Sequence, residues 1–109
     1  MNLTQREKDI IQQFKSEIVK RYPEDVMSII VFGSKARGDA SEESDIDIMV
    51  VTHSDNWRTG DKIRNIGYDL ELKHNLVLSI QVVSKSHMDH LKKIRSQFMQ
   101  NIERNGIAL

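Results

Sequence analysis

The chain has 109 residues, which is near the commonest size of one domain and leaves no room for a second core, so we expect a single domain spanning residues 1–109. Its 16 basic and 16 acidic side chains cancel, which excludes a general electrostatic attraction to nucleic acid or to a membrane. Without cysteine there is neither a disulfide framework nor a thiolate metal site, and without a long apolar stretch we expect a cytoplasmic protein that does not enter a membrane.

The N-terminal segment has the pattern of an amphipathic helix. Thr4 followed by Glu7 is a capping-box pair. Apolar side chains then recur at helical spacing, at Ile10, Ile11, Phe14, Ile18 and Val19. The pattern predicts a helix over about residues 4–21 that Pro23 closes.

Two short apolar runs follow, each too short for a helix. Val26–Phe32 is bounded by Gly33, and Ile46–Val51 is the second run, so both are predicted to be buried strands. The segment between them, Gly33–Ser44, is rich in small and charged residues. We expect it to be a loop with one short helical turn that begins near Ser34.

The second half predicts a helix, a strand and a last helix. The first of these helices has cap candidates at Ser54, Asp55 and Asn56 and apolar residues at Trp57, Ile63, Ile66 and Leu70, although Gly60 and Gly67 weaken it. Alternating apolar residues make Leu76–Val83 the third strand.

The last helix is indicated by four-residue spacing of Ile94, Phe98 and Ile102. Met88 and Leu91 would form an earlier turn of it, and Asn105-Gly106 would end it with glycine as a left-handed cap. The order of elements predicts a small sheet with helices packed against it, which is an α/β or α+β fold.

Asp45 and Asp47 form a carboxylate pair at the start of the second strand. Residues two apart on a strand project from the same face. At a separation of about 4 to 6 Å their repulsion is about 3 to 4 kcal/mol at an effective dielectric constant of about 20, so a cation is needed for both to stay ionised. Carboxylate oxygens select magnesium or manganese. The alternative is that the two side chains only bond to loop amides.

Gly33-Ser34, directly after the preceding strand, has the chemistry of a phosphate-binding turn. Glycine lets the backbone approach a phosphate, and a helix start directs N–H groups at it. Ser34 adds a hydroxyl donor, and Lys35 and Arg37 place positive charge within reach of the same anion, unless these two side chains are simply solvated. A P-loop is excluded because Asp39-Ala40 stands where Lys-Ser/Thr is required.

The segments Phe32-Gly33-Ser34-Lys35-Ala36-Arg37-Gly38 and Ser44-Asp45-Ile46-Asp47-Ile48 together resemble the signature of the minimal nucleotidyltransferases of the DNA polymerase β-like superfamily. The resemblance implies a mixed sheet flanked by helices. It also implies transfer of a nucleoside monophosphate from ATP or another triphosphate, with release of pyrophosphate. Members of the MntA type pair with a helical HEPN partner, and some are antitoxins.

By this resemblance Gly33 and Ser34 would hold the β and γ phosphates, and Asp45 and Asp47 would be the catalytic, magnesium-binding carboxylates. The family usually adds a third carboxylate on a following strand. Here that strand offers Ser79 and Gln81, and Gln81 is the predicted occupant of the third position. Because an amide cannot act as a base, two hypotheses stand: a magnesium-dependent enzyme with an unidentified protein or RNA hydroxyl acceptor, or a weak or inactive triphosphate-binding subunit of a helical partner.

Three further side chains have two interpretations each. Trp57 would stack on a base or pack in the core, and with six aromatic residues in the chain the core interpretation is favoured. His87 and His90, three apart, would clasp a metal or lie on the surface, and the surface interpretation is favoured because no second ligand pair accompanies them.

Overall fold

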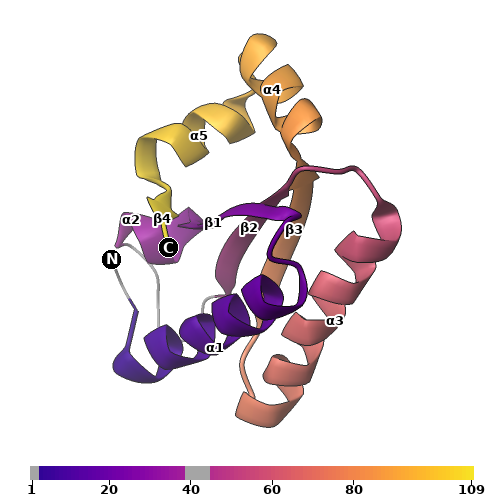
Figure 1. The fold of residues 1–109 in the computed structure, drawn as a ribbon. Helices are drawn as coiled ribbons and strands as arrows, with labels where there is room; N and C mark the ends of the chain where they lie inside the picture. Colours follow the sequence, from indigo (N-terminus) through magenta and orange to yellow (C-terminus); the bar gives the residue numbers. More distant parts are fainter. Residues whose placement is uncertain (1–2, 39–44) are drawn as a thin grey trace.

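A computed structural model describes residues 3–38 and 45–109, and within them the chain forms a four-stranded mixed sheet with helices on both faces (Figure 1). This confirms the predicted α/β class. The strands are β1 (Val26–Phe32), β2 (Ile46–Thr52), β3 (Leu78–Ser84) and β4 (Ile107–Ala108). The helices are α1 (Gln5–Arg21), α2 (Gly33–Arg37), α3 (Trp57–His74), α4 (Lys85–Lys93) and α5 (Gln97–Asn105).

The sheet order is β3-β2-β1-β4. β1 pairs antiparallel with both β2 and β4. β2 pairs parallel with β3, and α3 supplies the long crossover that a parallel pair requires. The central strands β1 and β2 therefore carry the core on both faces, while β3 and β4 lie at the edges.

Alternate residues of β2 divide the core into two layers. Ile46, Ile48 and Val50 are buried against α1 and α3. Met49 and Val51 point to the opposite face and are buried with Met99 and Ile102 of α5. Because side chains alternate along a strand, Asp47 lies on the same face of the sheet as Met49. This is the face that α4 and α5 partly cover.

Helix α1 begins with the predicted capping box. The Glu7 N–H donates to Thr4 Oγ1 at 3.1 Å, and the Thr4 N–H donates to Glu7 Oε1 at 2.9 Å. The buried apolar residues of this helix are Ile10, Ile11, Phe14 and Ile18. They repeat at the spacing that the sequence shows, so the predicted face packs on the sheet except for Val19, which is exposed.

Gly67 explains how α3 packs closely on β3. A Cβ at this position would overlap Cδ1 of Ile80, so the absence of a side chain lets the helix approach the strand. The glycine that lowers the helix propensity of this segment therefore serves the packing of α3 on β3.

The N-cap of α3 is Asn56, whose Oδ1 accepts from the Arg58 N–H at 3.0 Å.

The C-terminal prediction needs correction in three places. The single last helix is two helices, because Ile94 caps α4 and Arg95 adopts a left-handed φ of 53° before Ser96 caps α5. Gly106 ends α5 with φ −66°, so it is not a left-handed cap. Ile107 then pairs with Val31 in the unpredicted strand β4.

No helix within residues 3–38 and 45–109 combines the length and apolar character needed to cross a bilayer.

Candidate functional site

Gly33 joins β1 to α2 and lies against Asp47. Its φ of +73° is in the left-handed region, which glycine adopts without strain. A Cβ at Gly33 would overlap Oδ2 of Asp47 and lie 3.0 Å from its Cγ. The register explains the contact, since Phe32, the residue before Gly33, pairs with Asp47. Both conformation and space therefore require glycine here.

Asp45 and Asp47 stand where β2 begins. Asp45 is exposed and Asp47 is partly buried. Burial raises the pKa of the Asp47 carboxyl, and the negative charge of Asp45 raises it further, while a hydrogen bond from Ser79 and the positive charge of Arg37 act in the opposite direction. The net pKa of Asp47 lies above the ordinary value of 3.8, so in the folded chain this carboxyl group is harder to ionise than a solvated one.

Ser79, and not Gln81, is the β3 residue beside Asp47. The parallel register pairs Asp47 with Ser79 and pairs Met49 with Gln81. Gln81 lies on the same face of the sheet, two residues farther along β3, and is exposed. The position next to the carboxylate pair is thus occupied by a hydroxyl group that donates to Asp47.

Lys35 requires a correction to the predicted phosphate-binding set. Its side chain is 1% exposed, and its Nζ lies 2.9 Å from Oε2 of Glu7. An ammonium group paired in the interior cannot also contact a phosphate at the turn. Lys35 instead joins α2 to the first turn of α1, because the same Glu7 carboxylate caps that helix.

Arg37 and Ser34 remain near the carboxylates and the turn. Arg37 is exposed, and its charge acts on Asp47. Ser34 is the second residue of α2 and its carbonyl accepts from the Gly38 N–H at 3.0 Å. The N-cap of α2 is Phe32, which offers no side-chain hydrogen bond, so the first N–H groups of α2 can be directed at an anion.

The carboxylate pair fits a divalent cation of the hard type. Carboxylate oxygens are the ligands that magnesium and manganese prefer. Within the described residues no group of three or more histidine, cysteine, aspartate or glutamate side chains gathers as a metal site. Asp45 and Asp47 could hold such an ion as a pair. The acidic residues Asp39, Glu42 and Glu43 lie outside the described residues.

Residues 11–103 match the family model described as a nucleotidyltransferase domain. The chain belongs to this family. Most of the chain is thus covered by the match, including the Gly33-Ser34 turn and both aspartates.

Two curated relatives come from Methanocaldococcus jannaschii, and each carries the description "Putative protein adenylyltransferase". One is 35% identical over 103 residues, which cover 94% of this chain and 97% of the relative. The other is 30% identical over 102 residues, covering 93% of this chain and 96% of the relative. The family likeness therefore extends over nearly the whole length of both proteins.

Two solved structures share the fold of this nucleotidyltransferase. A "putative nucleotidyltransferase" from Sulfolobus solfataricus superposes with a TM-score of 0.57 at 18% identity, covering 92% of this chain and 76% of that one. A chain of the toxin-antitoxin MntA-HpeT superposes with a TM-score of 0.50 at 19% identity, covering 90% and 70%. At these identities the likeness concerns the fold.

Sequence reasoning named Ser79 but chose Gln81 for the third position, and it missed the contact of Glu7 with Lys35. Glu7 has no sequence signal for this contact, because the two residues come from different elements and meet only in the folded chain. The parallel register pairs Ile46 with Leu78 and so Asp47 with Ser79, which the predicted strand start at Leu76 does not give.

Proposed function

We propose that this nucleotidyltransferase is a magnesium-dependent enzyme that transfers a nucleoside monophosphate from ATP, or another triphosphate, to a hydroxyl group. The acceptor oxygen forms a bond to the α-phosphorus and loses its proton. The bond from that phosphorus to the α,β-bridging oxygen breaks, and pyrophosphate leaves with the bonding electrons. The observation that carries the proposal is the contact of the Gly33 turn with Asp47.

Each side chain has a distinct task in this proposal. Gly33 and Ser34 bind the terminal phosphates through backbone N–H groups and the serine hydroxyl. Asp45 and Asp47 hold the divalent cation, which when bound supplies neutralisation of the phosphate charge. Arg37 offers a bidentate guanidinium to a phosphate oxygen. Positioning and electrostatic complementarity supply most of the rate in such a site.

A protein hydroxyl is the acceptor that we favour. Both Methanocaldococcus relatives are described as protein adenylyltransferases, and their likeness covers nearly the whole chain. The described part of the chain forms one small unit around a single sheet. The acceptor's own surface would therefore contribute most of its recognition.

Thermal unfolding in the presence of magnesium tests the nucleotide site directly. A ligand that binds only the native state stabilises it by about 2.7 kcal/mol at a hundredfold excess over Kd. For a domain of this size that corresponds to a rise in Tm on the order of 10 °C. We expect the rise with ATP, compare it with GTP, CTP and UTP, and expect its loss in Asp45→Asn/Asp47→Asn.

A matched variant controls for the change of charge. Asp9→Asn/Asp69→Asn also removes two negative charges, but from exposed positions on α1 and α3. It should retain the magnesium-dependent rise in Tm. If no triphosphate raises the Tm of the wild-type chain, the nucleotide-binding proposal is wrong.

The second candidate function is a triphosphate-binding or inert subunit of a helical, HEPN-type partner. The observation that favours it is the hydroxyl of Ser79 beside Asp47, since a serine hydroxyl is a poor base at neutral pH. The fold is shared with a chain of a toxin-antitoxin pair. This function predicts that Asp45→Asn/Asp47→Asn binds the partner as tightly as the wild type does. Neither the variant nor the wild type should release pyrophosphate.

A further inference from the structure

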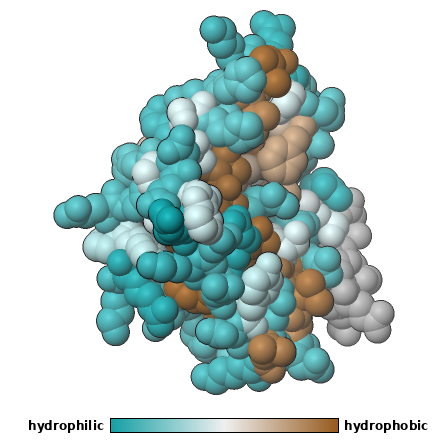
Figure 2. Space-filling model, turned by 90° about the vertical axis from the view of Figure 1, so that its right-hand side faces the viewer, coloured by the Kyte–Doolittle hydropathy of each residue, from teal (hydrophilic) through white to brown (hydrophobic). Residues whose placement is uncertain are grey.

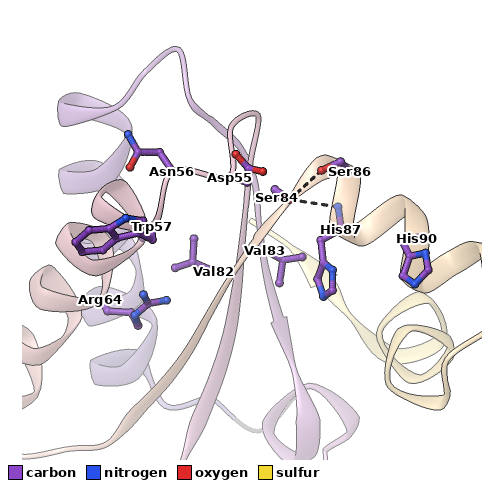
Figure 3. Close-up of a pocket in the computed structure, with 11 residues that line it drawn as sticks. Asp55, Asn56, Trp57, Arg64, Val82, Val83, Ser84, Ser86, His87 and His90 are labelled. Atoms are coloured by element: carbon purple, nitrogen blue, oxygen red, sulfur yellow. Dashed lines mark hydrogen bonds between the residues drawn. The ribbon is translucent and has the colours of Figure 1, made fainter.

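A cavity opens at the end of the sheet opposite to Asp45 and Asp47. It has a volume of about 580 Å³, which falls in the range of small-molecule sites. The beginnings of α3 and α4 form its two sides, and Val82 and Val83 lie between them (Figure 3). The cavity is therefore bounded by the carboxyl end of β3, which is where ligand crevices form next to parallel strands.

Trp57 stands at one side of this cavity with 65% of its surface exposed. The favoured prediction that it packs in the core is thus wrong. The Arg58 guanidinium lies 4.9 Å from the centre of the ring, a distance typical of a cation–π contact. A large aromatic side chain held at the edge of a cavity is a surface on which a flat ring can stack.

The other polar groups of the cavity come from both helices. Arg64 lies on the Trp57 side, and His87 and His90 project from α4 on the opposite side (Figure 3). The two imidazole rings are stacked, with their centres 6.4 Å apart. Ser84 and Ser86 add hydroxyl groups whose oxygens are 3.2 Å apart. The single carboxylate among the lining residues is Asp55.

The absence of a side chain at Gly60 leaves room for the guanidinium group of Arg64. A Cβ at Gly60 would lie 3.3 Å from Nη2 of Arg64 and 3.6 Å from Cγ1 of Val82. Arg64 also pairs with Asp61, at 2.6 Å between Nη2 and Oδ1. The partly exposed guanidinium of Arg64 therefore lies against Gly60 and is oriented by Asp61.

The cavity is separate from the proposed catalytic site. Ser79 is the β3 residue beside Asp47, and Val82, Val83 and Ser84 line the cavity three to five residues farther along the strand. This separation is about 10 to 17 Å, and none of the lining residues belongs to the proposed catalytic site. The surrounding surface on the α3 side of the molecule is mostly hydrophilic, with apolar side chains in a narrow, broken band (Figure 2).

From these observations we propose that the cavity is a second nucleotide site, which binds a phosphate-bearing planar ring. The base stacks on Trp57, on the side of the cavity where Arg64 also lies, and the phosphate is bound on the α4 side by the imidazoles of His87 and His90 and the serine hydroxyls. The nucleotide is either free or part of an RNA strand, and the chemistry of recognition is the same for both. The proposal does not depend on the transfer reaction.

The single tryptophan of the chain makes the proposal testable by fluorescence. We would titrate Asp45→Asn/Asp47→Asn with AMP in EDTA, where the catalytic site has neither its carboxylates nor a cation. A saturable change in Trp57 emission is expected, together with shifts of the amide signals of Gly60 and Ser84. Adenosine, which lacks the phosphate, should bind more weakly. A short oligoadenylate distinguishes a free nucleotide from a nucleotide within an RNA strand. If the cavity accepts only the latter, the oligoadenylate will bind and AMP will not.

Variants on the surface of the cavity complete the experiment. Trp57→Phe, measured by calorimetry, and His87→Ala/His90→Ala should each weaken binding about tenfold, which is the size of one stacking contact or one hydrogen bond to a phosphate. His53→Ala, an exposed histidine that is not among the lining residues, should bind like its parent. If neither AMP nor oligoadenylate shifts the emission or the amide signals at millimolar concentration, or if the cavity variants bind as tightly as the parent, the proposal is overturned.

Discussion

The space that a side chain on Gly33 would occupy is taken by the carboxylate of Asp47. The turn that follows β1 and the carboxylate near the start of β2 are therefore in close contact, and a side chain at Gly33 would displace that carboxylate. The antiparallel pairing of Phe32 with Asp47 fixes this relationship. A nucleotide site built from the two would have its phosphate-binding backbone and its cation ligands in contact.

Gly33→Ala should abolish nucleotide transfer and lower stability by about 1 kcal/mol or more, since alanine at positive φ is strained and its Cβ would displace the Asp47 carboxylate. Gly38→Ala is the matched variant, because Gly38 also has positive φ, at 85°, but caps the end of α2. Urea unfolding should show a similar loss for both, while only Gly33→Ala loses the rise in Tm with ATP and magnesium. Equal nucleotide responses in the two variants would contradict the steric explanation.

Asp47→Asn should change the pH dependence of stability in EDTA. Because the folded-state pKa of Asp47 is raised above 3.8, the native state holds this proton more tightly than the unfolded chain. Stability contributed by the protonated form is present at low pH and lost as pH rises through the folded pKa. Relative to wild type, Asp47→Asn should therefore become more stable as pH increases from about 4 to 7, measured by urea midpoints. If the difference in stability between Asp47→Asn and wild type stays constant across that pH range, the pKa of Asp47 is not raised in the folded chain.

Lys35→Ala should lower the free energy of unfolding by about 3 to 5 kcal/mol, because it leaves the Glu7 carboxylate buried without its partner. The comparison is Arg21→Ala, which breaks the exposed pair with Glu17 on the same helix and should change stability by less than about 1 kcal/mol. Calorimetric unfolding measures both. A small effect at Lys35 would mean that its ammonium group is not confined to this pair.

Glu7 should contribute to loss of stability in acid. Burial by itself raises the pKa of Glu7, but the N–H of Thr4 and the ammonium of Lys35 outweigh it, so the pKa lies below 4.5. A carboxylate with a lowered folded pKa stabilises the protein above its unfolded pKa and loses that contribution as pH falls through the folded value. Glu7→Gln should thus be less stable than wild type at neutral pH and approach it below about pH 4. Glu17→Gln, at an exposed pair, should follow the wild-type curve.

The elements that the sequence predicted well have strong local signals. The Thr4 and Glu7 capping box and the spacing of Ile10, Phe14 and Ile18 define α1 without reference to the rest of the chain. The bounds of β1 are also the predicted ones, because Gly33 interrupts the apolar run. Local periodicity and caps determine such elements, since the contacts involved are between residues close in sequence.

The errors occur where distant contacts decide the outcome. The four-residue spacing of Ile94, Phe98 and Ile102 concealed the break between α4 and α5, which the left-handed backbone of Arg95 makes and which the N-cap Ser96 marks. Strand β4 exists because Ile107 reaches Val31 at the edge of β1. Trp57 is exposed although aromatic residues are often buried, because it is the first residue of α3 and lies outside the buried face that begins at Gly60.

The sequence by itself determined the class of fold, the position of most strands and helices, and the pairing of a glycine turn with two aspartates, because each is encoded in spacing along the chain. The tertiary structure alone decided that Lys35 is buried against Glu7, that Ser79 lies beside Asp47, and that α3 and α4 enclose a second cavity. Strand register and helix docking set these contacts, and both depend on packing between residues far apart in sequence.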